Sequence, residues 1–147
     1  CGEGPGKDAL EALYSNLSNV AWKPLQPAER LGELLAAADV HVLPQRATVA
    51  DMVMPSKLIG MMASGRPVVA TAAPDTEIWK VLQGRGIVVP PGDARALADA
   101  IERLGATPQD GARYGMAARA YVEQNLERDK VLRRFEAELV ALVEQSR

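Results

Sequence analysis

Cysteine and histidine are almost missing from this chain, which contains only Cys1 and His41. A single cysteine excludes an internal disulfide framework and a zinc site built from cysteines alone. A single histidine excludes any site that needs two imidazole groups within the chain. Aromatic residues make up only 4% of the sequence. This scarcity argues against the stacked aromatic surfaces on which proteins bind single-stranded nucleic acid.

An excess of positive charge is also missing, as are long apolar runs. The formal net charge is −2 over 147 residues, so the overall electrostatics give no reason to expect a nucleic-acid partner. No apolar stretch approaches the roughly 20 residues that a helix needs to cross a bilayer. The chain therefore has the composition of an ordinary globular domain, with 48% hydrophobic and 24% charged residues.

The length and the first residues bear on domain organisation. At about 150 residues per domain, the sequence predicts one domain over residues 1–147. The chain opens with the glycine-rich segment Gly2-Glu3-Gly4-Pro5, and in α/β proteins such a loop normally follows a strand. We therefore expect a strand to precede residue 1, and the chain to be one domain of a longer protein.

Short apolar runs alternate with amphipathic stretches along the chain. This alternation predicts the α/β class, with an open parallel sheet of Rossmann-like type flanked by helices. Strands are predicted at residues 19–22, 40–43, 67–71 and 86–89. Helices are predicted at residues 8–16, 27–37, 55–63, 74–82, after a cap at Asp93, at about 108–126 and at about 128–146.

Ligands of open parallel sheets bind outside the carboxyl ends of the strands. The loops that occupy this position follow the predicted strands and cover residues 2–6, 23–26, 44–54 and 72–76. Gly2, Gly4 and Pro24 are therefore predicted to line a binding site.

The segment around Pro55 carries the strongest indication of chemistry. Pro55 is suited to open a helix, and Gly65 is suited to end it. The unpaired amides and the dipole at a helix start favour an anion, and a diphosphate is the natural ligand. The predicted donor contacts in this region are Asp51, Met54, Pro55, Ser56, Lys57 and Leu58.

These motifs resemble a known family. Residues 55–58 (Pro-Ser-Lys-Leu), followed by 62–69, are similar to the donor-binding helix of the family-four glycosyltransferases. Residues 2–5 resemble the family's glycine-rich loop, and residues 86–93 resemble its G-x-L-V-x-P-G-D turn. The resemblance covers residues 2–146. It is greatest to the colanic-acid and exopolysaccharide type, on residues 39–45.

The resemblance implies the C-terminal half of a two-domain GT-B glycosyltransferase. This half would bind a nucleotide-sugar donor, and the helix at 128–146 would pack on the protein's own N-terminal domain. The implied reaction is a retaining transfer, of hexosyltransferase type, to a polysaccharide or lipid-linked acceptor. No metal or other cofactor and no catalytic residue is expected in this chain, which alone would be inactive. The implied location is the cytoplasm, peripheral to the inner membrane if the acceptor is a lipid.

The sequence departs from the family at one position. The glutamate that normally contacts the donor's ribose would fall at position 60, where this chain has Gly60. Two alternatives therefore stay open beside the transferase. One is a nucleotide-sugar epimerase on the same scaffold. The other is a non-catalytic domain that no longer binds a donor.

Overall fold

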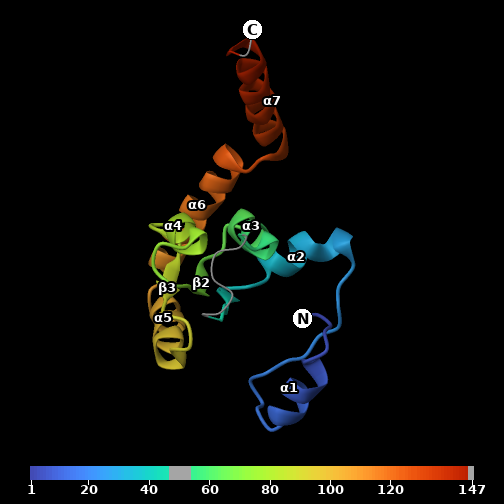
Figure 1. Cartoon of the computed structure of the whole chain (residues 1–147). Coiled ribbons are helices and arrows are strands. Elements are labelled where there is room, and N and C mark those ends of the chain that lie inside the picture. Colours follow the sequence, from blue (N-terminus) through green and yellow to red (C-terminus); the bar gives the residue numbers. More distant parts are fainter. Residues whose placement is uncertain (47–53, 146–147) are drawn as a thin grey trace. The chain divides into compact units, whose positions relative to one another are not determined.

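The computed structural model describes residues 1–46 and 54–145 (Figure 1). The chain divides into two compact units, Cys1–Leu34 and Leu35–Arg147.

The first unit contains one α-helix and one short 3-10 helix. Helix α1 spans Lys7–Leu13, and the 3-10 helix η1 spans Ala28–Arg30. Helix α2, Leu31–Ala36, runs across the boundary into the second unit. The prediction of a strand at residues 19–22 was wrong, because residue 19 lies in a turn and residues 20–22 have no regular secondary structure. An apolar run becomes a strand only where a neighbouring strand takes up its backbone groups, and the sheet includes no partner for it.

The second unit holds the sheet and most of the helices. Its strands are β1 His41–Leu43, β2 Val68–Thr71 and β3 Ile87–Val89. Its remaining helices are α3 Ser56–Ala63, α4 Glu77–Leu82, α5 Ala94–Ala106, α6 Pro108–Asn125 and α7 Arg128–Gln145. Strands and helices alternate from β1 to α5, which confirms the predicted α/β class (Figure 1).

The sheet is parallel throughout, with the order β1-β2-β3. Val69 of the central strand β2 pairs with Val42 on one side and with Ile87 on the other. All four residues of β2 are buried, as expected for a strand that is covered on both faces.

The side chains of β2 alternate between two hydrophobic clusters. Val68 and Ala70 belong to a cluster formed with α3, α4 and α6. Val69 belongs to a second cluster that includes Val89 of β3 and Leu104 of α5. Because neighbouring strand residues point to opposite faces, the two clusters cover opposite faces of the sheet.

Several helix ends follow from local sequence. Asp93 caps α5 as predicted, since its carboxylate accepts a hydrogen bond from the Ala96 amide at 2.9 Å. The helix predicted at 74–82 begins later, at Glu77, because the Thr76 hydroxyl accepts a hydrogen bond from the Trp79 amide. Asp75 precedes this cap with a φ of 67°, in the left-handed region.

Helix α7 carries an apolar stripe that is not buried. Leu132, Phe135, Leu139 and Val143 are each 48% exposed or more. Their spacing places them along one face of the helix. Among the described residues, no helix has the length and apolar character needed to span a bilayer.

Candidate functional site

The direction of α3 decides which edge of the sheet its first turn faces. At the end of the helix, the Ser64 Oγ lies 3.0 Å from Nε2 of His41, the first residue of β1. The C-terminal end of α3 therefore lies at the amino edge of the sheet. Eight helical residues rise about 12 Å in the opposite direction to the strands. Ser56 and Lys57 consequently lie toward the carboxyl edge, where open parallel sheets bind ligands.

No side chain of the described residues caps the first turn of α3. Pro55 is the N-cap residue, with extended backbone at φ −61° and ψ 128°, and it has no polar side-chain atom. The Leu58 amide donates to the Pro55 carbonyl at 2.9 Å. Within the described ranges, no acceptor is recorded for the amides of Ser56 and Lys57. These two amides can therefore donate to an anion.

The side chains of this turn divide between the surface and the core. Ser56 and Lys57 are exposed, and neither has a side-chain partner in the described part of the chain. Met54 and Pro55 are half-buried, and Met54 packs against the cluster formed with α3, α4 and α6. Leu58 is fully buried in the same cluster, and its amide is already hydrogen bonded. Leu58 thus anchors the helix while its two predecessors face solvent.

Two predicted contacts of the first unit, Gly2 and Pro24, lie on segments that are hydrogen bonded to each other. The Gly2 amide donates to the Lys23 carbonyl at 3.1 Å, and the Cys1 thiol donates to the Pro24 carbonyl at 3.0 Å. The glycine-rich loop and the loop at 23–26 are therefore side by side, although the strand expected between them is not formed. Open space surrounds Gly2 and Gly4, so a ligand can approach their backbone.

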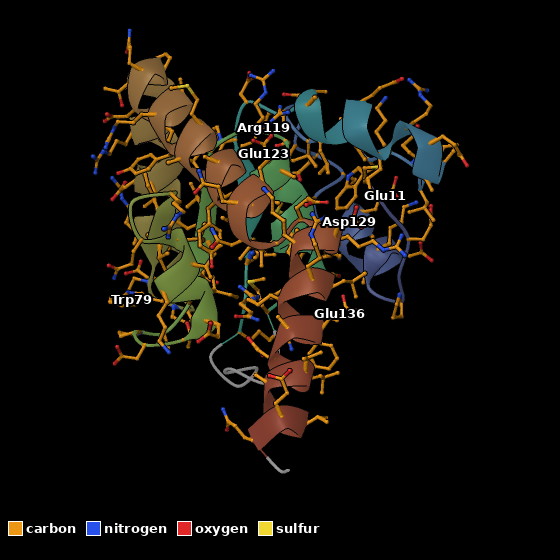
Figure 2. The ribbon with its side chains drawn as sticks, turned by 90° about the horizontal axis from the view of Figure 1, so that it is seen from above. Glu11, Trp79, Arg119, Glu123, Asp129 and Glu136 are labelled. Atoms are coloured by element: carbon orange, nitrogen blue, oxygen red, sulfur yellow. The ribbon has the colours of Figure 1, made fainter. Side chains whose placement is uncertain are left out.

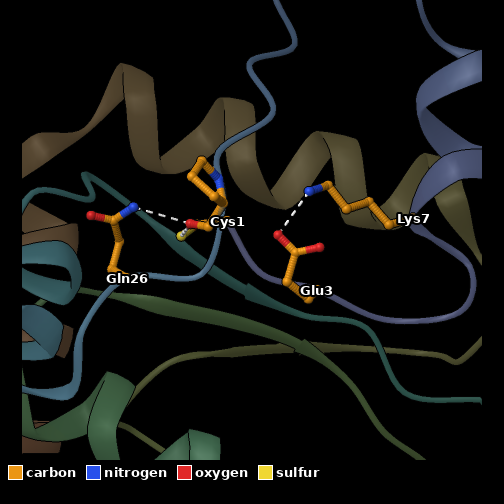
Figure 3. A network of polar contacts seen from close by, with 5 residues as sticks. Cys1, Glu3, Lys7 and Gln26 are labelled. Atoms are coloured by element: carbon orange, nitrogen blue, oxygen red, sulfur yellow. Dashed lines mark hydrogen bonds and ion pairs between the residues drawn. The ribbon is translucent and has the colours of Figure 1, made fainter.

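An ion pair closes the glycine-rich loop onto the first turn of α1. Lys7 Nζ lies 2.9 Å from Glu3 Oε1 (Figure 3). The hydrogen bond from Lys7 lowers the pKa of Glu3, and the Glu3 carboxylate raises the pKa of Lys7. Both groups are ionised at neutral pH. The Lys7 charge is consequently already compensated by Glu3.

Asp51 and Gly60 are the remaining positions at or near α3 that bear on donor binding. Asp51 lies outside the described residues. Gly60 lies against α2, because a Cβ atom at position 60 would come within 3.3 Å of Leu35 Cδ1. The glycine therefore fits a close approach of the two helices, and no carboxylate projects from this position of α3.

A pocket of about 710 Å³ lies at the opposite, amino edge of the sheet. Its lining includes the turn between α3 and β2 and the junction of α5 and α6. Arg66 contributes to it but donates to the Ala36 carbonyl at 3.0 Å. Arg119 contributes as well, and on the surface of α6 it pairs with Glu123 at 2.7 Å (Figure 2). This pocket is separate from the first turn of α3.

His41 has a structural environment, as its position in the middle of an apolar run predicts. Ser64 Oγ lies 2.6 Å from the Met61 carbonyl oxygen, to which it donates, and 3.0 Å from His41 Nε2, so the imidazole and the hydroxyl are hydrogen bonded. Burial lowers the pKa of His41, and the positive charge of Arg66 lowers it further, against a hydrogen bond with the Leu35 backbone. The imidazole is therefore neutral at pH 7.

Two residues at the carboxyl edge were not singled out from the sequence. The Thr71 hydroxyl accepts from the Gln45 amide at 2.5 Å and donates to the Gln45 carbonyl at 2.8 Å. No local motif predicts this pair, because Gln45 and Thr71 are 26 residues apart in the chain.

Solved structures show which class of protein has this fold. The sucrose-phosphate synthase of Thermosynechococcus elongatus superposes with a TM-score of 0.80 at 24% identity, over 98% of this chain and 37% of that one. The HepE protein of Anabaena, solved in complex with UDP-glucose, superposes with a TM-score of 0.77 at 20% identity, over 95% of this chain and 39% of that one. The fold is that of one half of a GT-B glycosyltransferase.

Sequence comparison then gives the family. Residues 1–107 match the family described as "Glycosyl transferases group 1", so the chain belongs to this family. It is 34% identical over 139 residues to the putative colanic acid biosynthesis glycosyl transferase WcaI of Escherichia coli K12. The match covers 91% of this chain and 33% of that relative, so the chain spans about a third of its length. The resemblance seen in the motifs is thereby confirmed.

Proposed function

We propose that this chain is the donor-binding part of a glycosyltransferase that uses a nucleoside-diphosphate sugar. The observation that carries the proposal is the first turn of α3. Two amides without acceptors in the described part of the chain and the exposed Lys57 lie there together, at the ligand-binding edge of the sheet. A diphosphate matches this arrangement in charge and in hydrogen-bond acceptors.

The same turn would act on the leaving group during transfer. As the bond between the sugar and the diphosphate breaks, negative charge grows on the diphosphate oxygens. The amides of Ser56 and Lys57, the helix dipole and the Lys57 ammonium group would stabilise that charge. We propose a transfer that retains the anomeric configuration and requires no metal. In this proposal Leu58 anchors α3, while Gly2, Gly4, Pro24, Asp51, Met54 and Pro55 stay predicted donor contacts.

Properties of the relatives support this assignment. HepE was solved with UDP-glucose and also with UDP and glucose, and the curated relative is named for colanic acid biosynthesis. By analogy, we propose that the acceptor is a growing polysaccharide or a lipid-linked sugar, and that the reaction takes place in the cytoplasm. The exposed apolar stripe of α7 supports the further proposal that this helix packs on the protein's own N-terminal domain.

The experiment that tests the proposal is a binding measurement with UDP, GDP and ADP, by calorimetry and by thermal unfolding. We expect one of the three to bind, and at 100 times its Kd to raise the free energy of unfolding by about 2.7 kcal/mol. Absence of binding by all three at millimolar concentration would contradict the assignment. It would favour instead a domain that has lost its donor, the alternative suggested by Gly60.

A further inference from the structure

The basic side chains of the second unit, up to the end of α6, divide into two groups. Most form an ion pair or donate to a backbone carbonyl, and these are Arg66, Lys80, Arg85, Arg95, Arg103, Arg113 and Arg119. Arg46 and Lys57 have no such partner among the described residues. Lys57 is the cation of the proposed diphosphate site. Arg46 is therefore the remaining cation of this group without an assigned role.

The position of Arg46 is set by the end of β1. The ladder between β1 and β2 ends at the pair Leu43 and Ala70. Arg46 follows two residues after Pro44 and is exposed. It therefore leaves the sheet at the carboxyl edge, the edge toward which the first turn of α3 faces.

The Thr71 hydroxyl holds the chain immediately before Arg46. It accepts a hydrogen bond from the Gln45 amide and donates one to the Gln45 carbonyl, at 2.5 and 2.8 Å. Thr71 is only 5% exposed, so these bonds form where water does not compete readily. One side chain thus takes up both backbone groups of Gln45 just beyond the end of the ladder, and it holds the peptide that leads into Arg46.

We propose that Arg46 is a second cation for the diphosphate of the donor, and that Thr71 is its positioning residue. The inference rests on the proposed function, because it assigns a further residue to the same site. An arginine can donate two parallel hydrogen bonds to a phosphate group. Lys57 and the α3 amides would hold the diphosphate from the helix, and Arg46 would hold it from the end of β1.

The test is a set of binding measurements with the 147-residue chain and the nucleoside diphosphate that binds most tightly among UDP, GDP and ADP. Arg46→Gln should weaken binding roughly tenfold, since it removes a charge-assisted contact. Arg103→Gln is the matched control, because Arg103 is an exposed arginine in the last turn of α5, and this variant should leave the affinity unchanged. The corresponding nucleoside, which has no phosphate, should bind Arg46→Gln as it binds the unaltered chain.

Two substitutions at position 71 test the positioning role of Thr71. Thr71→Val keeps the shape of the side chain but removes the hydroxyl, so it should speed amide exchange at Gln45 and weaken diphosphate binding several-fold. Thr71→Ser keeps the hydroxyl and should restore both properties. The loss should appear for the diphosphate and not for the nucleoside, whereas a general loss of packing would affect both.

The possible results separate the two proposals. If the unaltered chain binds no nucleoside diphosphate, the proposed function fails and this inference falls with it. If the chain binds the diphosphate and Arg46→Gln binds it equally well, Arg46 is not a ligand contact and only this inference is overturned. If Thr71→Val leaves exchange at Gln45 unchanged, Thr71 has no positioning role.

Discussion

Gly115 of α6 packs directly on the backbone of Gly65, in the turn between α3 and β2. A Cβ atom at position 115 would overlap the Gly65 carbonyl oxygen. Gly65 itself has a φ of 74°, in the left-handed region that ends helices. Helix α6 therefore packs against the turn in which the chain reverses direction between α3 and β2. The packing of α6 consequently helps to fix the direction of α3.

Gly115→Ala should destabilise the chain by about 3 kcal/mol, because the new methyl group meets backbone that cannot move aside. Chemical denaturation would measure this change in the free energy of unfolding. Gly105→Ala in α5 is the matched control, since no atom lies within 4 Å of a Cβ at that position. The control should be neutral or stabilising by up to about 1 kcal/mol. Equal effects at the two positions would contradict the close packing.

Lys57→Ala should weaken the binding of a nucleoside diphosphate by roughly tenfold, since the variant removes one of the charges that face the diphosphate. Titration calorimetry at low and high salt would measure the effect, which should shrink as salt screens the charge. Lys80→Ala is the control, because Lys80 is also an exposed lysine but pairs with Glu77 at 3.1 Å. If both variants bind the nucleoside diphosphate with equal affinity, Lys57 does not contact the diphosphate.

The titration of His41 should be shifted to low pH. It is the only histidine of the chain, so its imidazole signals in proton NMR are directly assignable. Burial lowers its pKa, and we expect a midpoint below the ordinary value of about 6.5.

The sign of the effect on stability follows from linkage. When the folded pKa is lowered, the unfolded state binds the proton more tightly. The His41 contribution to the free energy of unfolding should therefore be full above about pH 6.5 and should fall as the pH drops below that value. A midpoint at or above 6.5 would show that the imidazole is not buried as described.

Asp93→Ala should lower the free energy of unfolding by about 1 kcal/mol, because the variant removes the cap of the Ala96 amide at the start of α5. Asp93→Asn keeps an acceptor at this position and should retain most of the stability. Thermal unfolding of the two variants would measure the difference. A loss of equal size in both would assign the effect to the charge of Asp93 and not to its hydrogen bond.

Local patterns predicted most of the second unit. Apolar runs and amphipathic spacing predicted β1 to β3 and their helices, and Asp93 predicted the start of α5. Pro55 and Gly65 predicted the limits of α3. These predictions succeeded because helix caps and side-chain periodicity act over a few neighbouring residues. The same reasoning failed at residues 19–22, where strand formation depends on a partner elsewhere in the chain.

The residues of the candidate site also differ in whether the sequence alone could predict them. Ser56 and Lys57 could be chosen from the sequence, because a helix start with a hydroxyl and a charge is visible as a short motif. Arg46 and Thr71 could not, because the hydroxyl that binds the Gln45 peptide comes from a strand 26 residues further along the chain. No local spacing reports that contact.

The sequence by itself determined the α/β class, the family motifs and the first turn of α3, since each depends on residues close together in the chain. Only the tertiary structure decided which carbonyl Gly115 packs against, which peptide Thr71 holds and which cations stay without a partner in the described part of the chain. Those relationships depend on segments that meet only when the sheet and its helices assemble.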